Sequence, residues 1–110
     1  MSTLLRGLDT AVILAVIDAA ITEIPELSGS KIRHQWALAA VAAASEGIVA
    51  GLSTHADIAA AARATAAAMF HVKPLSFGND VVAYLLAHVL LTMNGEEISL
   101  AETVELVAAS

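Results

Sequence analysis

Apolar residues occupy every side of one stretch of the chain, residues 81–93, which contains no Asp, Glu, Lys or Arg. Asn79 precedes the stretch as a good helix N-cap, and Asp80 places a negative charge at the positive end of the helix dipole. Asn94 and Gly95 form a stop signal, because glycine takes the left-handed conformation at a helix C-terminus without steric cost. A helix that is apolar all round must be covered by other elements, and this one is shorter than the roughly 20 apolar residues of a membrane span. We therefore expect a central helix.

The apolar pattern also predicts a helix near the start of the chain. Asp9 or Thr10 is its cap, and it runs to about Ile24. Pro25 ends it, because the residue before a proline is pushed out of helical geometry. Residues 1–8 are expected to be a loose lead-in.

A second helix is expected from Lys31 to about Ser45, with Ser30 as its cap. This helix opens on Lys31, Arg33 and His34, and cations are unfavourable at the positive end of the helix dipole. Two interpretations stay open for this cluster. It is either a solvated helix end or a segment with a purpose other than helix formation.

Two capping-box patterns predict the remaining helices, at residues 54–57 (Thr-His-Ala-Asp) and 99–102 (Ser-Leu-Ala-Glu). The first begins an alanine-rich helix that runs to about Phe70 and packs closely against the central helix. Residues 71–76 then form a loop. Nothing in the pattern is typical of a sheet. The expected fold is all-α, a single domain over residues 1–110 with about five helices around the central apolar helix.

The composition of the chain argues against several classes of function. The chain has no cysteine, so neither disulfides nor thiolate metal sites are expected. Its net charge is −6 with five Lys and Arg, which argues against binding to nucleic acid or anionic lipid. No basic segment precedes the first apolar run, so no secretory signal is expected and the expected compartment is the cytoplasm. The hydrophobic fraction of 58% exceeds the roughly 45–50% of an average domain, which predicts a homo-oligomer or a partner interface.

Residues 73–84 resemble the active-site region of the Fic/Doc family, the bacterial nucleotidyl- and phosphotransferases that include the Doc toxins. The family motif reads His-x-Phe-x-Asp/Glu-Gly-Asn-Gly/Lys-Arg-x-x-Arg, and this chain reads Lys-Pro-Leu-Ser-Phe-Gly-Asn-Asp-Val-Val-Ala-Tyr in register with it. The order of elements is also similar, from a Leu-Ser-Gly turn to an apolar helix that ends in Asn-Gly. The resemblance implies a Fic/Doc-like helical domain. Its remnant of the motif is the loop Lys73, Pro74, Leu75, Phe77, Gly78, Asn79 and Asp80.

The chain departs from the family at the residues that carry the chemistry. Lys73 stands where the family has its general base, a histidine, and Phe77 stands where it has its magnesium-binding acid. Val81 and Tyr84 replace the arginines that hold phosphate, and Asp80 adds negative charge where a triphosphate would approach. Without these groups the usual means of phosphoryl transfer are missing. The resemblance therefore implies an inactive enzyme that needs neither metal nor cofactor.

Such a protein is expected to act by binding a bacterial protein, and a phage or mobile element is an expected source for its gene. Doc proteins take an antitoxin segment along a helical groove, so a peptide-in-groove mode is one form this binding could take. Trp36, His71 and Tyr84 are candidate interface residues. Two alternatives stay open: a residual transferase that uses His71 or Lys73, and an unrelated helical oligomer.

Overall fold

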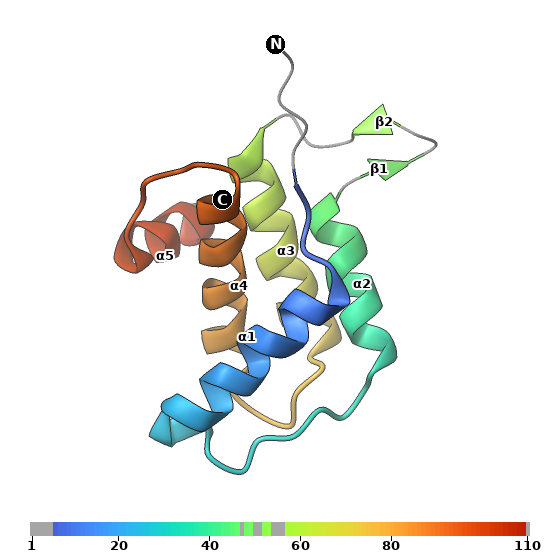
Figure 1. Ribbon diagram of the computed structural model, residues 1–110, viewed down its shortest axis with the longest axis vertical. Helices are drawn as coiled ribbons and strands as arrows, with labels where there is room; N and C mark the ends of the chain where they lie inside the picture. Colours follow the sequence, from blue (N-terminus) through green and yellow to red (C-terminus); the bar gives the residue numbers. More distant parts are fainter. Residues whose placement is uncertain (1–5, 47, 50–51, 54–56, 110) are drawn as a thin grey trace.

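The computed structural model describes residues 6–46, 48–49, 52–53 and 57–109, and over them it is an all-α domain of five helices (Figure 1). The helices are α1 (Thr10–Glu23), α2 (Trp36–Glu46), α3 (Ile58–Val72), α4 (Asn79–Met93) and α5 (Leu100–Ala108). A single 3₁₀ turn, η1 (Pro25–Leu27), follows α1. Between α2 and α3 the short strands β1 (Ile48–Val49) and β2 (Leu52–Ser53) pair antiparallel, so the expectation of no sheet was wrong for this hairpin.

The expected single central helix is a pair of helices. Helix α3 contacts α2, α4 and α5, and helix α4 contacts α1, α3 and α5. Six of its side chains are buried: Val82, Ala83, Leu86, Ala87, Leu90 and Leu91. Its most extensive contact is with α3, whose buried alanines Ala61, Ala62 and Ala66 allow a close approach of the two helices. The alanine-rich composition of α3 is therefore a packing feature, because small side chains leave room for the neighbouring helix.

The stop signal after α4 forms a complete Schellman motif. Gly95 has a φ of +88°, its N–H donates to Thr92 O (3.1 Å), and the N–H of Glu96 donates to Leu91 O (3.0 Å). The side chain of Asn94 has a further use that its local pattern did not reveal. It accepts from the N–H of Arg6 (2.7 Å) and donates to Arg6 O (2.9 Å), which fixes the incoming chain against the end of α4.

The expected loose lead-in was wrong over residues 6–8. Leu8 is fully buried in the core, and its N–H donates to the Ser45 hydroxyl (2.7 Å). Side chains of two distant helices, Ser45 on α2 and Asn94 on α4, thus hold this extended segment by its backbone. The segment becomes part of the core through contacts more than 30 residues away in sequence, which no local pattern indicates.

Two predicted caps are confirmed. The Asp9 carboxylate accepts from the N–H of Val12 at the start of α1 (2.9 Å). At α5 the capping box is complete, with Ser99 Oγ accepting from the N–H of Glu102 (3.1 Å) and the Glu102 carboxylate accepting from the N–H of Ser99 (3.1 Å). These hydrogen bonds, first that from the Ser99 backbone, lower the pKa of Glu102 below its ordinary value.

Three predicted boundaries were wrong. Helix α2 begins at Trp36 instead of Lys31, and α3 continues to Val72, so that His71 lies in its last turn. The cap of α3 is Asp57, whose carboxylate accepts from the N–H of Ala60 (2.8 Å), because the helix starts at Ile58. The other residues of the predicted capping box, 54–56, lie outside the described residues.

Candidate functional site

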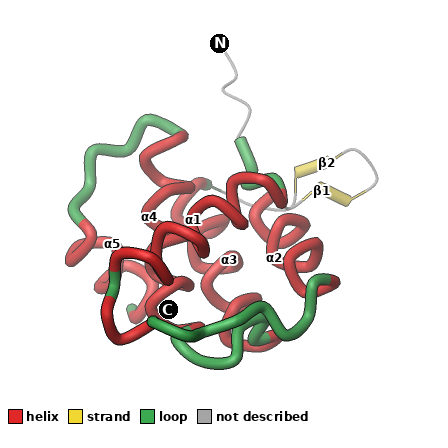
Figure 2. Tube along the Cα trace, turned by 60° about the horizontal axis from the view of Figure 1, so that its bottom comes forward, coloured by secondary structure: helices red, strands yellow, loops and turns green. Residues whose placement is uncertain are grey.

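Two loops lie side by side at one end of the helical bundle, and Figure 2 turns this end forward. One loop leads from η1 into α2, and the other connects α3 to α4. Their backbones pair antiparallel around an isolated bridge between Ile32 and Leu75. Arg33 donates its N–H to Pro74 O (2.6 Å), and Ser76 donates its N–H to Lys31 O (2.8 Å). Residues far apart in the sequence thus form one surface.

Ser30 fastens the two loops together. Its hydroxyl donates to Phe77 O (2.6 Å) and lies within 3.4 Å of both the Phe77 N–H and the Ser76 hydroxyl. The expected role of Ser30 as the cap of the second helix was therefore wrong. The residue is 5% exposed, so its hydroxyl needs these partners, because a buried polar group without a hydrogen bond is costly.

The loop residues that match the Fic/Doc motif have structural roles at the start of α4. Gly78 is the N-cap, with a φ of +82°, and an added Cβ would overlap the side chain of Leu27. Asn79 is the first helical residue instead of the predicted cap. Its side chain accepts from the N–H of Leu75 (2.9 Å) and donates to Leu75 O (2.9 Å), so it closes the loop onto itself.

The other residues of this loop divide into buried and exposed sets. Pro74 and Leu75 are buried beneath the paired backbones. Lys73 is exposed and adopts a left-handed conformation with a φ of +45°. Phe77 is 44% exposed, and Asp80 is exposed in the first turn of α4, where its charge favours the helix dipole. The exposed side chains of the loop are thus a cation, an aromatic ring and a carboxylate.

The three predicted interface residues do not form one cluster. Trp36 is 64% exposed at the start of α2 and its ring lies 5.8 Å from that of His34, centroid to centroid. Tyr84 is half-buried and makes an edge-to-face contact with Phe70 at 5.8 Å, which joins α3 to α4. His71 is exposed on α3. No ring contact joins any two of the three predicted residues, all of which the structure describes.

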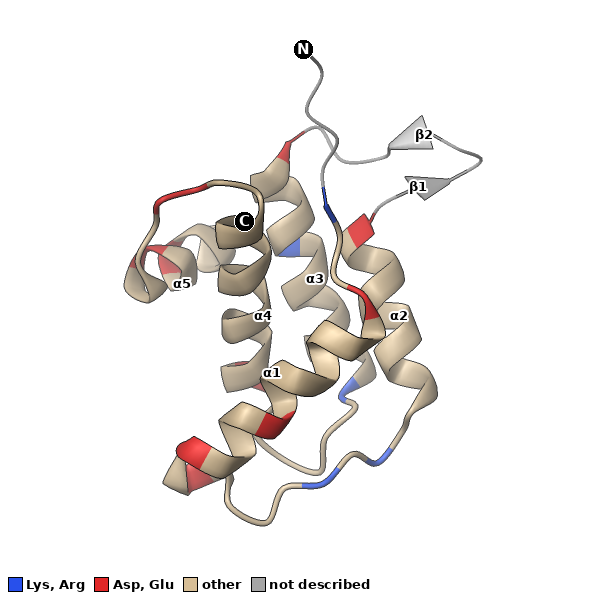
Figure 3. Ribbon diagram, in the orientation of Figure 1, with Lys and Arg blue, Asp and Glu red and all other residues tan. Residues whose placement is uncertain are grey.

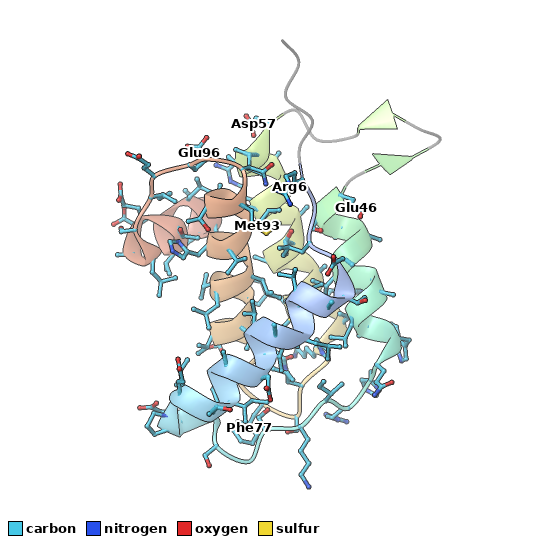
Figure 4. The ribbon with its side chains drawn as sticks, in the orientation of Figure 1. Arg6, Glu46, Asp57, Phe77, Met93 and Glu96 are labelled. Carbon is cyan, nitrogen blue, oxygen red and sulfur yellow. The ribbon has the colours of Figure 1, made fainter. Side chains whose placement is uncertain are left out.

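The paired loops concentrate positive charge. We define the basic end as residues 31–36 and 73–77, which contain Lys31, Arg33 and Lys73, three of the five Lys and Arg of the chain, and no Asp or Glu. Figure 3 shows these cations in blue around the lower loops and most of the acidic side chains elsewhere. Phe77 lies at the opposite end of the molecule from Arg6, Glu46, Asp57 and Glu96 (Figure 4). None of the three cations has an ion-pair partner among the described residues.

The sequence placed the remnant of the motif on the α3–α4 loop and the candidate interface at Trp36, His71 and Tyr84, and it did not indicate that Lys31 and Arg33 contribute to the same surface as the loop. The one available signal was the clustering of cations where a helix start disfavours them. That signal showed that the segment was unusual, but not that it pairs with residues 74–76.

An open groove adjoins the basic end. It has a volume of about 690 Å³ and runs between α1 and the first residues of the basic end. Leu14, Ile21 and Ile32 supply its apolar lining, and Asp18 and Lys31 are its charged residues. A smaller cavity of about 280 Å³ lies between α1 and α4, next to His88 and Glu23. The His88 Nδ1 atom lies 3.1 Å from the hydroxyl of Thr103, which ties α5 to α4.

Comparisons with known proteins do not assign the chain to a family. No protein-family model, curated protein or solved structure matches it. Among the described residues there is no group of three or more His, Asp and Glu that could hold a metal ion. None of the described helices is long and apolar enough to cross a membrane.

Proposed function

We propose that this protein acts by binding, without catalysis, and that its basic end takes an acidic segment of another protein. The observation that supports the proposal is the local excess of positive charge in a chain whose net charge is −6. Lys31, Arg33 and Lys73 are all exposed on the paired loops, and residues 31–36 and 73–77 contain no carboxylate, since Asp80 lies beyond them in the first turn of α4. An acidic partner is attracted to this end and repelled by the remaining surface, so charge selects the docking face as well as the partner.

Two exposed aromatic side chains support a protein as the partner. Trp36 and Phe77 are 64% and 44% exposed at the basic end. Large aromatic side chains supply much of the binding energy at protein interfaces, where they fill pockets of the partner while charges lie around them. A cationic surface that combines such anchors with Arg33 suits an acidic segment that also carries apolar residues.

The resemblance to the Fic/Doc family supports a proposal for the source of this protein and for its partner. In our interpretation the chain is a degenerate Doc-like protein, encoded by a phage or mobile element, that binds a bacterial protein in the cytoplasm. Lys73 and Phe77 stand where that family has its general base and its metal ligand. The aromatic ring of Phe77 cannot bind magnesium, and Lys73 replaces the histidine of the motif with a different side chain. Loss of these groups removes the transferase chemistry and leaves a surface for recognition.

Charge reversal at the basic end tests the proposal with a matched control. Immobilised protein is incubated with bacterial lysate, and retained proteins are identified for the wild type, Arg33→Glu and Arg6→Glu. Both variants change the net charge equally, but Arg6 lies at the far end of the molecule and only its backbone is bonded to Asn94. We expect acidic proteins that the wild type and Arg6→Glu retain and Arg33→Glu loses. We also expect this binding to weaken as salt is raised, since ionic strength screens exposed charges.

Equal retention by the two variants would refute a role for the basic end. The alternative function, a residual transferase that uses His71 or Lys73, has its own test. ATP with magnesium would raise the melting temperature of such an enzyme by mass action on the native state. A nucleotide-dependent rise that the His71→Ala or Lys73→Ala variant abolishes would replace the binding proposal with the enzyme.

A further inference from the structure

The groove beside α1 differs in charge from the basic end that it adjoins. Its floor and walls are largely apolar, with Leu14 from α1 42% exposed and Ile32 half-buried on the opposite wall. One acid and one base, Asp18 and Lys31, stand along it. Neither side chain has an ion-pair partner among the described residues. An exposed apolar groove of this kind is typical of an interaction site.

The two charged residues of the groove indicate which kinds of occupant suit it. A strongly acidic segment would be repelled by Asp18, and a basic one by Lys31, so neither kind of single-sign partner suits the groove. A surface that carries one acid and one base is complementary to itself when related by a two-fold axis. In such an interface the contact between the acid and the base forms twice, because the acid of each copy meets the base of the other copy.

We propose that the groove is the dimer interface of this protein and that its occupant is α1 of a second copy. The exposed Leu14 of each copy packs into the groove of the other, and Asp18 of each copy lies against the partner's Lys31. The arrangement is isologous and closes at two copies, since both grooves are filled. It also covers part of the apolar surface that a chain with 58% hydrophobic residues exposes.

The dimer goes beyond the proposed function and does not depend on it. In the dimer Lys31 pairs with Asp18 of the second copy, but Arg33 and Lys73 do not line the groove and remain free for an acidic partner. Substitution of Arg33 is therefore expected to affect partner binding alone, and substitution of Leu14 to affect the dimer alone. Failure of one proposal would leave the other standing.

The first test compares two leucines of the same exposure. Leu14 and Leu100 are each 42% exposed, but Leu14 lines the groove and Leu100 lies on α5. In sedimentation equilibrium we expect a concentration-dependent dimer for the wild type and for Leu100→Glu. For Leu14→Glu we expect a dissociation constant raised by about tenfold or more, because two buried carboxylates are introduced per dimer. Circular dichroism checks that each variant remains folded.

The second test asks whether Asp18 and Lys31 pair between copies. Asp18→Lys and Lys31→Glu each create two like-charge contacts in the dimer, and each is expected to weaken association. Mixing the two variants in equal amounts restores opposite charges at both contacts of a mixed dimer, so we expect association to return when they are combined. A monomeric wild type, equal association of Leu14→Glu and Leu100→Glu, or no recovery on mixing would each overturn the proposal.

Discussion

Gly78→Ala is the substitution that most directly tests how the basic end is held to the bundle. The Gly78 N-cap has a φ of +82°, where a residue with a Cβ is strained by about 1 kcal/mol. The new methyl group would also overlap the side chain of Leu27, which is 2% exposed and packed in the core. Overpacking of this kind costs about 1–3 kcal/mol. The two effects together predict a loss of about 2–4 kcal/mol in the free energy of unfolding.

Two other glycines serve as controls that measure the cost of the backbone strain without the cost of the steric overlap. Gly29 and Gly95 both have a φ of +88°, and an added Cβ at either position meets nothing within 4 Å. Gly29→Ala and Gly95→Ala are therefore expected to lose only the conformational part, about 1 kcal/mol each. The change that alanine makes to the unfolded chain is common to all three variants and cancels in the comparison.

Urea denaturation followed by circular dichroism measures these differences, provided that the slope against denaturant stays the same for all variants. Leu27→Ala in the Gly78→Ala background supplies the internal check. Removal of the overlapping side chain should make the double variant more stable than the sum of the two single losses allows. If Gly78→Ala loses no more than Gly29→Ala, the packing of Leu27 against the start of α4 does not constrain this loop and our account is wrong.

Three further predictions concern single side chains. Lys73→Gly is expected to raise the free energy of unfolding by about 0.5–1 kcal/mol in urea denaturation, since glycine relieves the left-handed strain. The same variant is expected to bind an acidic partner more weakly. A loss of stability would show that the Lys73 side chain packs favourably. Asn79→Ala is expected to cost about 1–3 kcal/mol in the same measurement, because it removes both hydrogen bonds to the Leu75 backbone. For Glu102, whose pKa the Ser99 N–H lowers from 4.5, the stabilisation is present above pH 4.5 and is lost as the pH falls through the lower folded-state pKa. The melting temperature of Glu102→Gln should therefore fall below that of the wild type at pH 7, and the gap should close in acid; a gap that persists in acid would exclude this linkage.

Sequence patterns predicted the parts of the fold whose causes are local. Asp9, the capping box at Ser99 and the glycine after α4 act within a few residues of themselves, so their signals are complete in the printed sequence. The burial of α4 was also predicted, because a helix without a polar face requires cover from other elements, but the equally central position of α3 was not.

The start of α2 and the burial of Leu8 have distant causes. Ser30 bonds with Phe77, and Leu8 with Ser45, over separations of 47 and 37 residues. A cap residue such as Ser30 offers the same hydroxyl to a helix N-terminus or to a neighbouring loop, and only the tertiary arrangement decides between them. For the same reason the sequence indicated Lys73 and Arg33 separately but did not place them on one surface.

The charges of the segment from Lys31 to Arg33 help to explain why it is extended instead of helical. As the first turn of a helix, its cations would face the positive end of the dipole. As a strand-like segment, its side chains alternate between the two faces of the backbone. Lys31 and Arg33 are accordingly exposed, and Ile32 between them turns inward beside its bridge partner Leu75. The pattern cation–apolar–cation is thus unfavourable at the start of a helix and favourable for backbone pairing with residues 74–76. The residues that make this end of the molecule basic therefore also favour the extended backbone on which they are exposed.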